Sequence, residues 1–190
     1  MHIVGILLAA GAGTRFGGGK LLAKLGDGTA VGRRACANLQ AAVDDVIAVV
    51  RPDDDELALE LAAAGARVTF CPDAHAGMGA SLAHGARAAA GADAVIIALA
   101  DMPWIEPATL QAVADALRRA EPLVVPRHRG RRGHPVGFGR VHLPALTSLG
   151  NDEGAREVIA SAPAIHWIDV DDPGVLRDVD TPADLGEAPM

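Results

Sequence analysis

The chain has 190 residues, half of them hydrophobic, and a formal net charge of −7 at pH 7. This length and apolar content predict one domain with a substantial core, spanning residues 1–190. An acidic chain lacks the extended basic face of a general nucleic-acid binder, so we expect no nucleic-acid partner. Cys36 and Cys71 are too few for a disulfide framework or a four-ligand zinc site, and no signal peptide or membrane-length apolar segment is present. We therefore expect a cytoplasmic protein without a membrane partner.

The first predicted element is a strand over residues 3–8, followed by a glycine-rich loop. The strand is apolar without alternation, as expected for a strand buried on both faces of a parallel sheet. Five glycines follow between residues 11 and 19, and Arg15 and Lys20 add positive charge. Glycines let backbone N–H groups turn inward, and the two cations attract phosphate oxygens. The loop predicts a phosphate cradle, with a merely flexible glycine-rich turn as the alternative.

Two familiar glycine loops do not fit this spacing. A dinucleotide fingerprint needs a third glycine where this chain has Phe16, which disfavours NAD binding. A Walker A loop needs a glycine and a hydroxyl residue where Thr14 and Leu21 stand around the Gly19–Lys20 pair. A P-loop ATPase is therefore disfavoured as well.

Helical and apolar segments then alternate for at least four cycles. Helices are predicted at 31–42, 53–64, 79–90, 109–119 and 153–160, strands at 46–50, 67–71, 94–100, 123–126, 136–138 and 165–170, and a basic loop at 127–135. This alternation predicts an α/β fold with a mainly parallel sheet and helices on both faces, a Rossmann-like three-layer αβα sandwich. Ligands bind beyond the C-terminal strand ends of such sheets, so the glycine loop and Asp101 should share one edge.

Asp101 follows the most hydrophobic predicted strand, and Pro103 prevents that strand from continuing. A carboxylate at this place suits Mg²⁺, which takes one or two carboxylates while phosphates and waters complete its shell. The alternative is an Asp that caps the next helix.

A second acidic group near the C-terminus contains Asp178, Asp180 and Asp184. In an extended segment Asp178 and Asp180 project to the same face and could present two carboxylates to one metal–phosphate centre. The alternative is turn chemistry, with Asp180 or Thr181 capping a helix begun by Pro182.

Two further segments carry candidate ligand contacts. The basic loop contains four arginines and could clamp a phosphorylated substrate, or it could be a solvated surface loop. Within it, Gly133 and Pro135 fix the backbone around His134, which can donate hydrogen bonds. Ser81 follows two glycines at a predicted helix start and could contact a nucleotide, or it could be an ordinary first-turn residue.

Six segments in order resemble the molybdenum cofactor (molybdopterin) cytidylyltransferases, within the MobA-like nucleotidyltransferases. These segments read LAAGAGTRFGGGKLLA, GMGASL, LADMPWI, RGHPVGF, GNDEGAR and DVDTPADL, and they span almost the whole chain. The resemblance implies a fold of the nucleotide-diphospho-sugar transferase type. It also implies a Mg²⁺-dependent reaction that joins CTP to the terminal phosphate of molybdopterin and releases pyrophosphate.

Residue roles also follow from the resemblance. Catalysis would rest on Arg15, Lys20 and Asp101. The nucleotide would contact Leu8, Ala9, Ala10, Gly11, Gly13, Arg15, Lys20 and Ser81. The metal would take Asp101 with Asp178 or Asp180, and the pterin-bearing substrate would face His134, Asp152 and Arg156.

The base and the acceptor leave alternatives open. Related guanylyltransferases often have Gly-Gly where this chain has Ala10–Gly11, so the Ala10 methyl narrows the base pocket and favours CTP over GTP. The alternatives are a guanylyltransferase, another sugar- or alcohol-phosphate nucleotidyltransferase, or a non-catalytic carrier of the molybdenum cofactor. The resemblance also implies transient contact with a molybdenum enzyme or its maturation chaperone.

Overall fold

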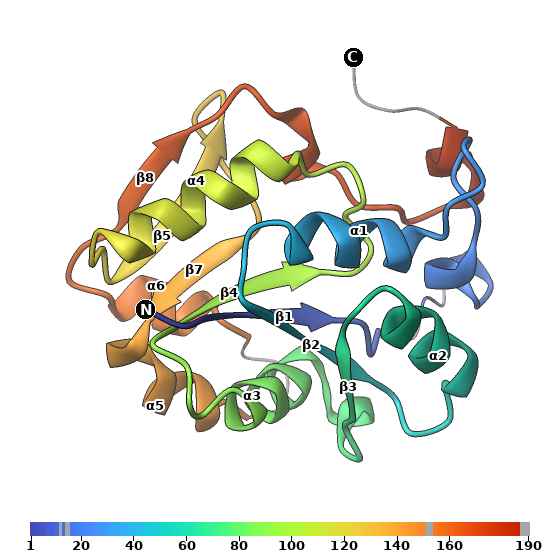
Figure 1. The fold of residues 1–190 in the computed structure, drawn as a ribbon, viewed down its shortest axis with the longest axis horizontal. Coiled ribbons are helices and arrows are strands. Elements are labelled where there is room, and N and C mark those ends of the chain that lie inside the picture. The colour runs from blue at the N-terminus through green and yellow to red at the C-terminus, as the bar shows by residue number, and fades with distance from the viewer. Residues whose placement is uncertain (12, 14–15, 151–153, 187–190) are drawn as a thin grey trace.

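The computed structural model describes residues 1–11, 13, 16–150 and 154–186 (Figure 1). The strands are β1 (Ile3–Leu8), β2 (Asp45–Val50), β3 (Arg67–Phe70), β4 (Ala94–Leu99), β5 (Leu123–His128), β6 (Arg131–Arg132), β7 (Val136–Gly139) and β8 (His166–Asp169). The α-helices are α1 (Val31–Gln40), α2 (Asp55–Ala63), α3 (Met78–Ala88), α4 (Pro107–Arg118), α5 (Leu143–Thr147) and α6 (Arg156–Ser161). Arg15 and Asp152, two of the predicted site residues, lie outside the described residues.

The strands form one mixed sheet in the order β3-β2-β1-β4-β7-β5-β6, with β8 paired to β5. Strands β1 to β4 are mutually parallel, so their carboxyl ends meet at one edge. Strand β7 runs antiparallel to both β4 and β5, and β8 is parallel to β5. The prediction of a mainly parallel sheet is confirmed, and β6 and β7 run antiparallel to the other strands.

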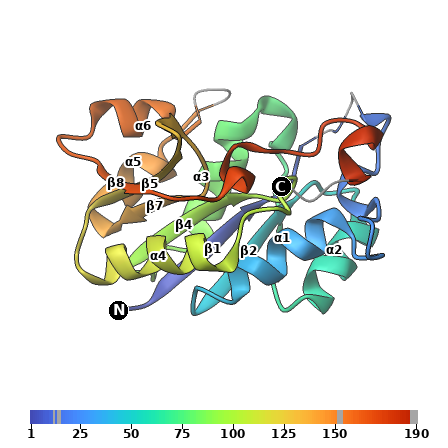
Figure 2. The ribbon, with the colours of Figure 1, turned by 90° about the horizontal axis from the view of Figure 1, so that it is seen from above.

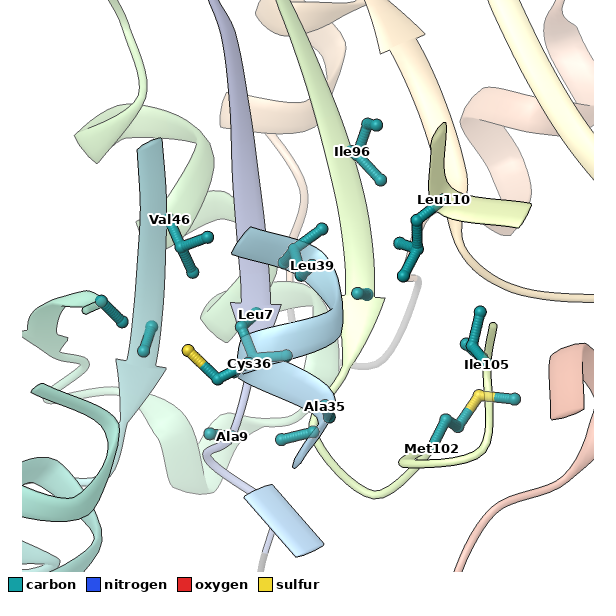
Figure 3. Close-up of a cluster of buried hydrophobic side chains, with 14 of the residues drawn as sticks. Leu7, Ala9, Ala35, Cys36, Leu39, Val46, Ile96, Met102, Ile105 and Leu110 are labelled. Carbon is teal, nitrogen blue, oxygen red and sulfur yellow. The ribbon is translucent and has the colours of Figure 1, made fainter. Parts of the chain in front are cut away.

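Helices cover both faces of the sheet, as the two apolar cores show. On one face, residues of α1, α2 and α4 such as Leu39, Leu61 and Leu110 pack with Leu7 of β1, as Figure 3 shows for Leu7, Leu39 and Leu110. On the other face, residues of α3, α5 and α6 pack with Ile6. Successive β1 side chains thus enter opposite cores, as a strand buried on both faces requires. The three-layer sandwich is confirmed.

The basic segment 127–135 differs from the predicted loop. It contains the end of β5 and all of β6, which pair as an antiparallel hairpin through Arg127–Arg132 and His128–Arg131. The two residues between the strands, Arg129 and Gly130, both have positive φ, of 49° and 75°. This is the backbone of a tight two-residue hairpin turn. The prediction of a loop was wrong because these strand residues are polar and give no apolar alternation.

Smaller differences lie at helix boundaries. Helix α4 begins at Pro107, two residues before the predicted start, because proline is well suited to the first helical position. Helix α3 begins at Met78, and α6 spans Arg156–Ser161 instead of 153–160. In the described part of the chain, no helix has both the length and the apolar character needed to cross a membrane.

Candidate active site

The glycine loop leaves the carboxyl end of β1 in a conformation that depends on glycine. The Ala9 N–H still bonds Val49 O at 2.9 Å, which continues the β1–β2 ladder into the loop. Gly17, Gly18 and Gly19 then have φ values of 89°, 96° and 65°, which L side chains rarely adopt. Gly13 O accepts bonds from the N–H groups of Phe16 and Gly18. The sequence of three left-handed residues turns the chain back so that Lys20 faces the sheet edge.

Lys20 forms the centre of the site. It begins a short 3₁₀ turn, Lys20–Leu22, and its side chain is 13% exposed. Its Nζ donates to Asp101 Oδ2 at 2.8 Å and lies 3.7 Å from Asp180 Oδ1. One ammonium therefore bridges two carboxylates that are far apart in the sequence. Lys20 and Asp101 meet because parallel β1 and β4 are neighbours and end at the same edge.

Asp101 follows β4 by two residues and does not cap the next helix. The first residue before α4 is Glu106, and the carboxylate that accepts the Glu106 N–H belongs to Asp172. The capping alternative for Asp101 is therefore wrong. The Asp101 carbonyl oxygen accepts the Val179 N–H at 2.8 Å, which holds the C-terminal segment beside β4.

The two predicted C-terminal metal ligands have different environments. Val179 between them is fully buried, Asp180 is half-buried near Lys20, and Asp178 is exposed. After Asp180, a 3₁₀ turn spans Pro182–Gly186, and Asp184 accepts the N–H groups of Asp180 and Thr181. Asp184 also accepts the Thr181 hydroxyl. The side chain that accepts the hydrogen bonds of this turn is therefore that of Asp184, and Thr181 is one of its donors. The Asp180 carboxylate faces Lys20 instead.

His134 lies in the segment between β6 and β7, where its N–H bonds Val175 O at 2.9 Å and its peptide bond to Pro135 is cis. Its Nδ1 is buried and has no hydrogen-bond partner among the described residues. The pKa of His134 is lowered to about 4, chiefly by burial; nearby Arg132 and Arg156 add to the shift, and Asp101 opposes it. The imidazole is therefore neutral at pH 7 and lies within electrostatic range of Asp101.

The remaining predicted contacts lie around this centre. Leu8 ends β1, Ala9 and Ala10 are buried just beyond it, and Gly11 is exposed. Arg156 begins α6 and is exposed. Ser81 lies in the first turn of α3 and is 4% exposed. Its contact with a nucleotide stays a prediction.

Two residues that the sequence did not single out line a pocket with the glycine loop. Arg51 and Asp54 follow β2, form an ion pair at 3.3 Å, and border this pocket together with Gly11, Gly13 and Lys20. Their position directly after a predicted strand could have identified them as candidates, because the ends of parallel strands share one edge of the sheet. Arg51 adds a cation close to the phosphate cradle.

Comparisons with known proteins show the family of the chain. A family model described as the MobA-like NTP transferase domain matches residues 5–166. The purine catabolism protein PucB of Bacillus subtilis (strain 168) is 32% identical over 193 residues, covering 95% of this chain and 93% of PucB. A phosphoenolpyruvate guanylyltransferase of Salinispora arenicola (strain CNS-205) is 36% identical over 155 residues, covering 77% of this chain and 65% of that protein.

Solved structures show the same likeness in three dimensions. The crystal structure of Rv0371c from Mycobacterium tuberculosis H37Rv has a TM-score of 0.82 and 31% identity, covering 97% of this chain and 95% of that one. A complex of Rv0371c with manganese has a TM-score of 0.74 and 25% identity, covering 98% and 94%. The family match, the likeness to PucB and the likeness to Rv0371c show that this chain belongs to the MobA-like NTP transferase family and is a nucleotidyltransferase.

Proposed function

We propose that the protein transfers the CMP group of CTP to the terminal phosphate of molybdopterin, with Mg²⁺, and releases pyrophosphate. The observation that carries the proposal is the convergence of Asp101 and Asp180 on Lys20, beside a glycine loop at the sheet edge. Such an edge offers cations and backbone N–H groups for phosphates next to carboxylates for a metal.

The two carboxylates fit a magnesium ion that is shared with the nucleotide. Asp101 Oδ2 and Asp180 Oδ1 both lie within 4 Å of one ammonium, so they meet at one point. Among residues 1–11, 13, 16–150 and 154–186, no group of three or more His, Cys, Asp or Glu side chains is placed to hold a metal by itself. A metal at Asp101 and Asp180 would complete its shell with phosphate oxygens and waters, which is the usual arrangement for Mg²⁺. Bound there, Mg²⁺ would supply charge stabilisation for the phosphates.

The chain's own groups bind and align the phosphates. An oxygen of the acceptor phosphate forms a bond to the α-phosphorus of CTP while the bond from that phosphorus to the bridging oxygen breaks. The bridging oxygen leaves with its electron pair as part of pyrophosphate. Lys20 and the loop N–H groups stabilise the charge that develops on the phosphate oxygens. The acceptor phosphate is already ionised, so the reaction needs no general base, and alignment supplies much of the rate.

The residues around the cradle support the choice of cytosine as the base and of an anionic acceptor. Ala10 is 8% exposed two residues after β1. A methyl group there, where related guanylyltransferases often have glycine, would narrow the space for a base and favour the smaller pyrimidine. His134 lies near Asp101, with Arg132 and Arg156 in electrostatic range. These groups suit an anionic acceptor that would bind beside Asp101.

A second candidate is transfer of GMP from GTP to phosphoenolpyruvate. The supporting observation is the 36% identity to a protein named for that reaction. Both candidates use a phosphate group as nucleophile and would use the same Lys20 edge.

The test is pyrophosphate release in a matrix of CTP or GTP with molybdopterin, phosphoenolpyruvate or no acceptor, each with Mg²⁺ and with Mn²⁺. Release that requires CTP and molybdopterin supports the cytidylyltransferase. Release that requires GTP and phosphoenolpyruvate supports the second candidate and overturns the Ala10 argument. Binding of the cofactor without release in any combination would favour a carrier. Asp101→Asn serves as the control, because release at this site must fall in that variant.

A further inference from the structure

The segment from Asp172 to Asp180, here called the C-terminal strap, contacts three residues of the candidate site, Lys20, Asp101 and His134. Figure 2 shows the red C-terminal chain running from the β8 side across the molecule to the blue segment that contains the glycine loop. The strap begins with a 3₁₀ turn over Pro173–Leu176 and ends at Asp180, 3.7 Å from Lys20.

Asp172 fixes the start of the strap to helix α4. Its side chain is 1% exposed, and one carboxylate oxygen accepts the Glu106 N–H at 2.9 Å and the Thr109 hydroxyl at 2.7 Å. The other oxygen accepts the Gly174 N–H at 2.8 Å. A buried carboxylate with three donors is strongly held, and loss of an acceptor there leaves buried donors unpaired.

The strap then follows the two segments that carry Asp101 and His134. A Cβ at Gly174 would lie 2.2 Å from the Trp104 carbonyl oxygen, so the two backbones touch. Val175 O accepts the His134 N–H at 2.9 Å, and a Cβ at Gly133 would lie 2.6 Å from that same oxygen. This close backbone packing leaves the strap little freedom between its ends.

The far end of the strap joins the metal-side carboxylates. The Val179 N–H donates to the Asp101 carbonyl oxygen at 2.8 Å, and the next residue, Asp180, faces Lys20. Among the described residues, Asp172 forms no hydrogen bond with Lys20 or Asp101, so its influence on them passes through the strap.

We propose that Asp172 is a positioning residue, which pins the strap to α4 so that Asp180 and Asp101 are held together on Lys20. This inference rests on the proposed function in one respect, the assignment of Asp101 and Asp180 as the metal carboxylates. Asn at position 172 has nearly the same shape but turns an NH₂ group toward at least one of its three donors. The strap should then detach from α4 more often, and the carboxylates should be less well aligned.

The first test measures backbone amide hydrogen exchange in the whole protein. Asp172→Asn should raise exchange of the Val179 and His134 amides at least ~10-fold, because both are held by the strap. The Ala9 amide, bonded to Val49 O, is the internal reference and should not change. Asp115→Asn is the matched control, because it removes a half-buried α4 carboxylate that is bonded to Gln111 and Arg118.

A second pair of variants, with a milder change, keeps the proposal testable if Asp172→Asn does not fold. Thr109→Val removes the hydroxyl donor to Asp172 while keeping the side-chain shape, and Thr109→Ser restores the donor. Val179 exchange should rise in the valine variant and return toward the wild-type rate in the serine variant. Unchanged Val179 exchange in both Asp172→Asn and Thr109→Val, or an equal rise at Ala9, would overturn the proposal.

The second test measures the Mn²⁺ concentration that gives half-maximal pyrophosphate release. Asp172→Asn should raise it at least ~10-fold, with the KM for the nucleotide changed by less than ~3-fold. A substitution that only destabilised the fold would lower the fraction of active protein and leave the half-maximal Mn²⁺ concentration unchanged. An unchanged half-maximal Mn²⁺ concentration would therefore contradict the positioning role. If the wild-type protein releases no pyrophosphate, the proposed function fails, and the exchange experiment alone decides the role of Asp172.

Discussion

Lys20 Nζ lies 2.8 Å from Asp101 Oδ2, although 81 residues separate them in the sequence. The contact joins the two best predicted features, the glycine loop after β1 and the carboxylate after β4. It also shows a competition, because the ammonium now occupies the place toward which Asp101 and Asp180 both point. If a nucleotide and a metal bind at this edge as proposed, we expect Lys20 to exchange its carboxylate contacts for phosphate contacts.

Lys20→Met should therefore lower kcat for pyrophosphate release by about 10²–10³-fold while the protein remains folded. The methionine side chain keeps similar length and apolar contacts but has no charge for the phosphates. Steady-state kinetics with the active nucleotide and circular dichroism measure the two properties. Lys24→Met is the matched control, because Lys24 is exposed four residues later. Equal activity in the two variants would remove Lys20 from the mechanism.

Asp180 and Asp178 should differ as metal ligands. Asp180→Asn removes the carboxylate near Lys20 and should raise the half-saturating Mn²⁺ concentration by about 10–100-fold, because a charged ligand is lost. Asp178→Asn removes an exposed carboxylate and should change that concentration by less than ~2-fold. Titration of each variant with Mn²⁺, followed by electron paramagnetic resonance, measures the affinity without turnover. The opposite ranking would assign the metal to Asp178.

The sheet could be predicted because its strands are buried on both faces. Residues such as Ile6 and Leu7 face different cores, so their segment is apolar without alternation and cannot be mistaken for a surface loop. The β5–β6 hairpin could not be recognised in the same way, because Arg131 and Arg132 are exposed. Its one local signal was Gly130, which supplies a left-handed turn residue.

The site could be predicted where local backbone chemistry determines it. Lys20 follows a run of glycines, and Asp101 follows an apolar strand, so the flanking sequence identifies each of them as a candidate site residue. Asp172 carries none, because it stands in an acidic, proline-containing segment that resembles a solvated turn. Its three donors include Glu106 just before α4 and Thr109 in its first turn, both more than 60 residues away. Only the tertiary arrangement shows that this carboxylate is buried.

The stability of the protein should depend on His134 below neutral pH. The pKa of this imidazole is lowered from 6.5 to about 4, chiefly by burial, with Arg132 and Arg156 adding to the shift and Asp101 opposing it. Between these two values the unfolded chain binds more protons than the folded one. The free energy of unfolding from this group is therefore fully present above pH 6.5 and is lost as the pH falls toward 4.

The shift corresponds to a loss of about 2 kcal/mol between pH 7 and pH 5. Urea denaturation at both pH values measures the loss. His134→Asn removes the titrating group and should be less sensitive to pH by that amount. If the variant and the wild-type protein lose the same free energy, His134 does not govern this pH range.

Gly174 should tolerate no side chain, because the strap touches the Trp104 backbone at that residue. A Cβ there would lie 2.2 Å from the Trp104 carbonyl oxygen and 2.8 Å from Asp172 Oδ1. A backbone carbonyl cannot rotate away as a flexible side chain can, so the strap itself must move. Gly174→Ala should lower the free energy of unfolding by about 1–3 kcal/mol, as overpacking does elsewhere, and should also weaken metal activation.

The matched control for this prediction lies in the same C-terminal region. A Cβ at Gly186 meets no atom of the described residues within 4 Å, so Gly186→Ala should leave both stability and metal activation close to wild type. Urea denaturation and Mn²⁺ titration of the two alanine variants separate crowding of the strap from a general effect of alanine. If Gly174→Ala has wild-type stability and metal activation, the strap can shift away from Trp104 with no loss of free energy. Its close packing on Trp104 would then not hold Asp180 beside Lys20.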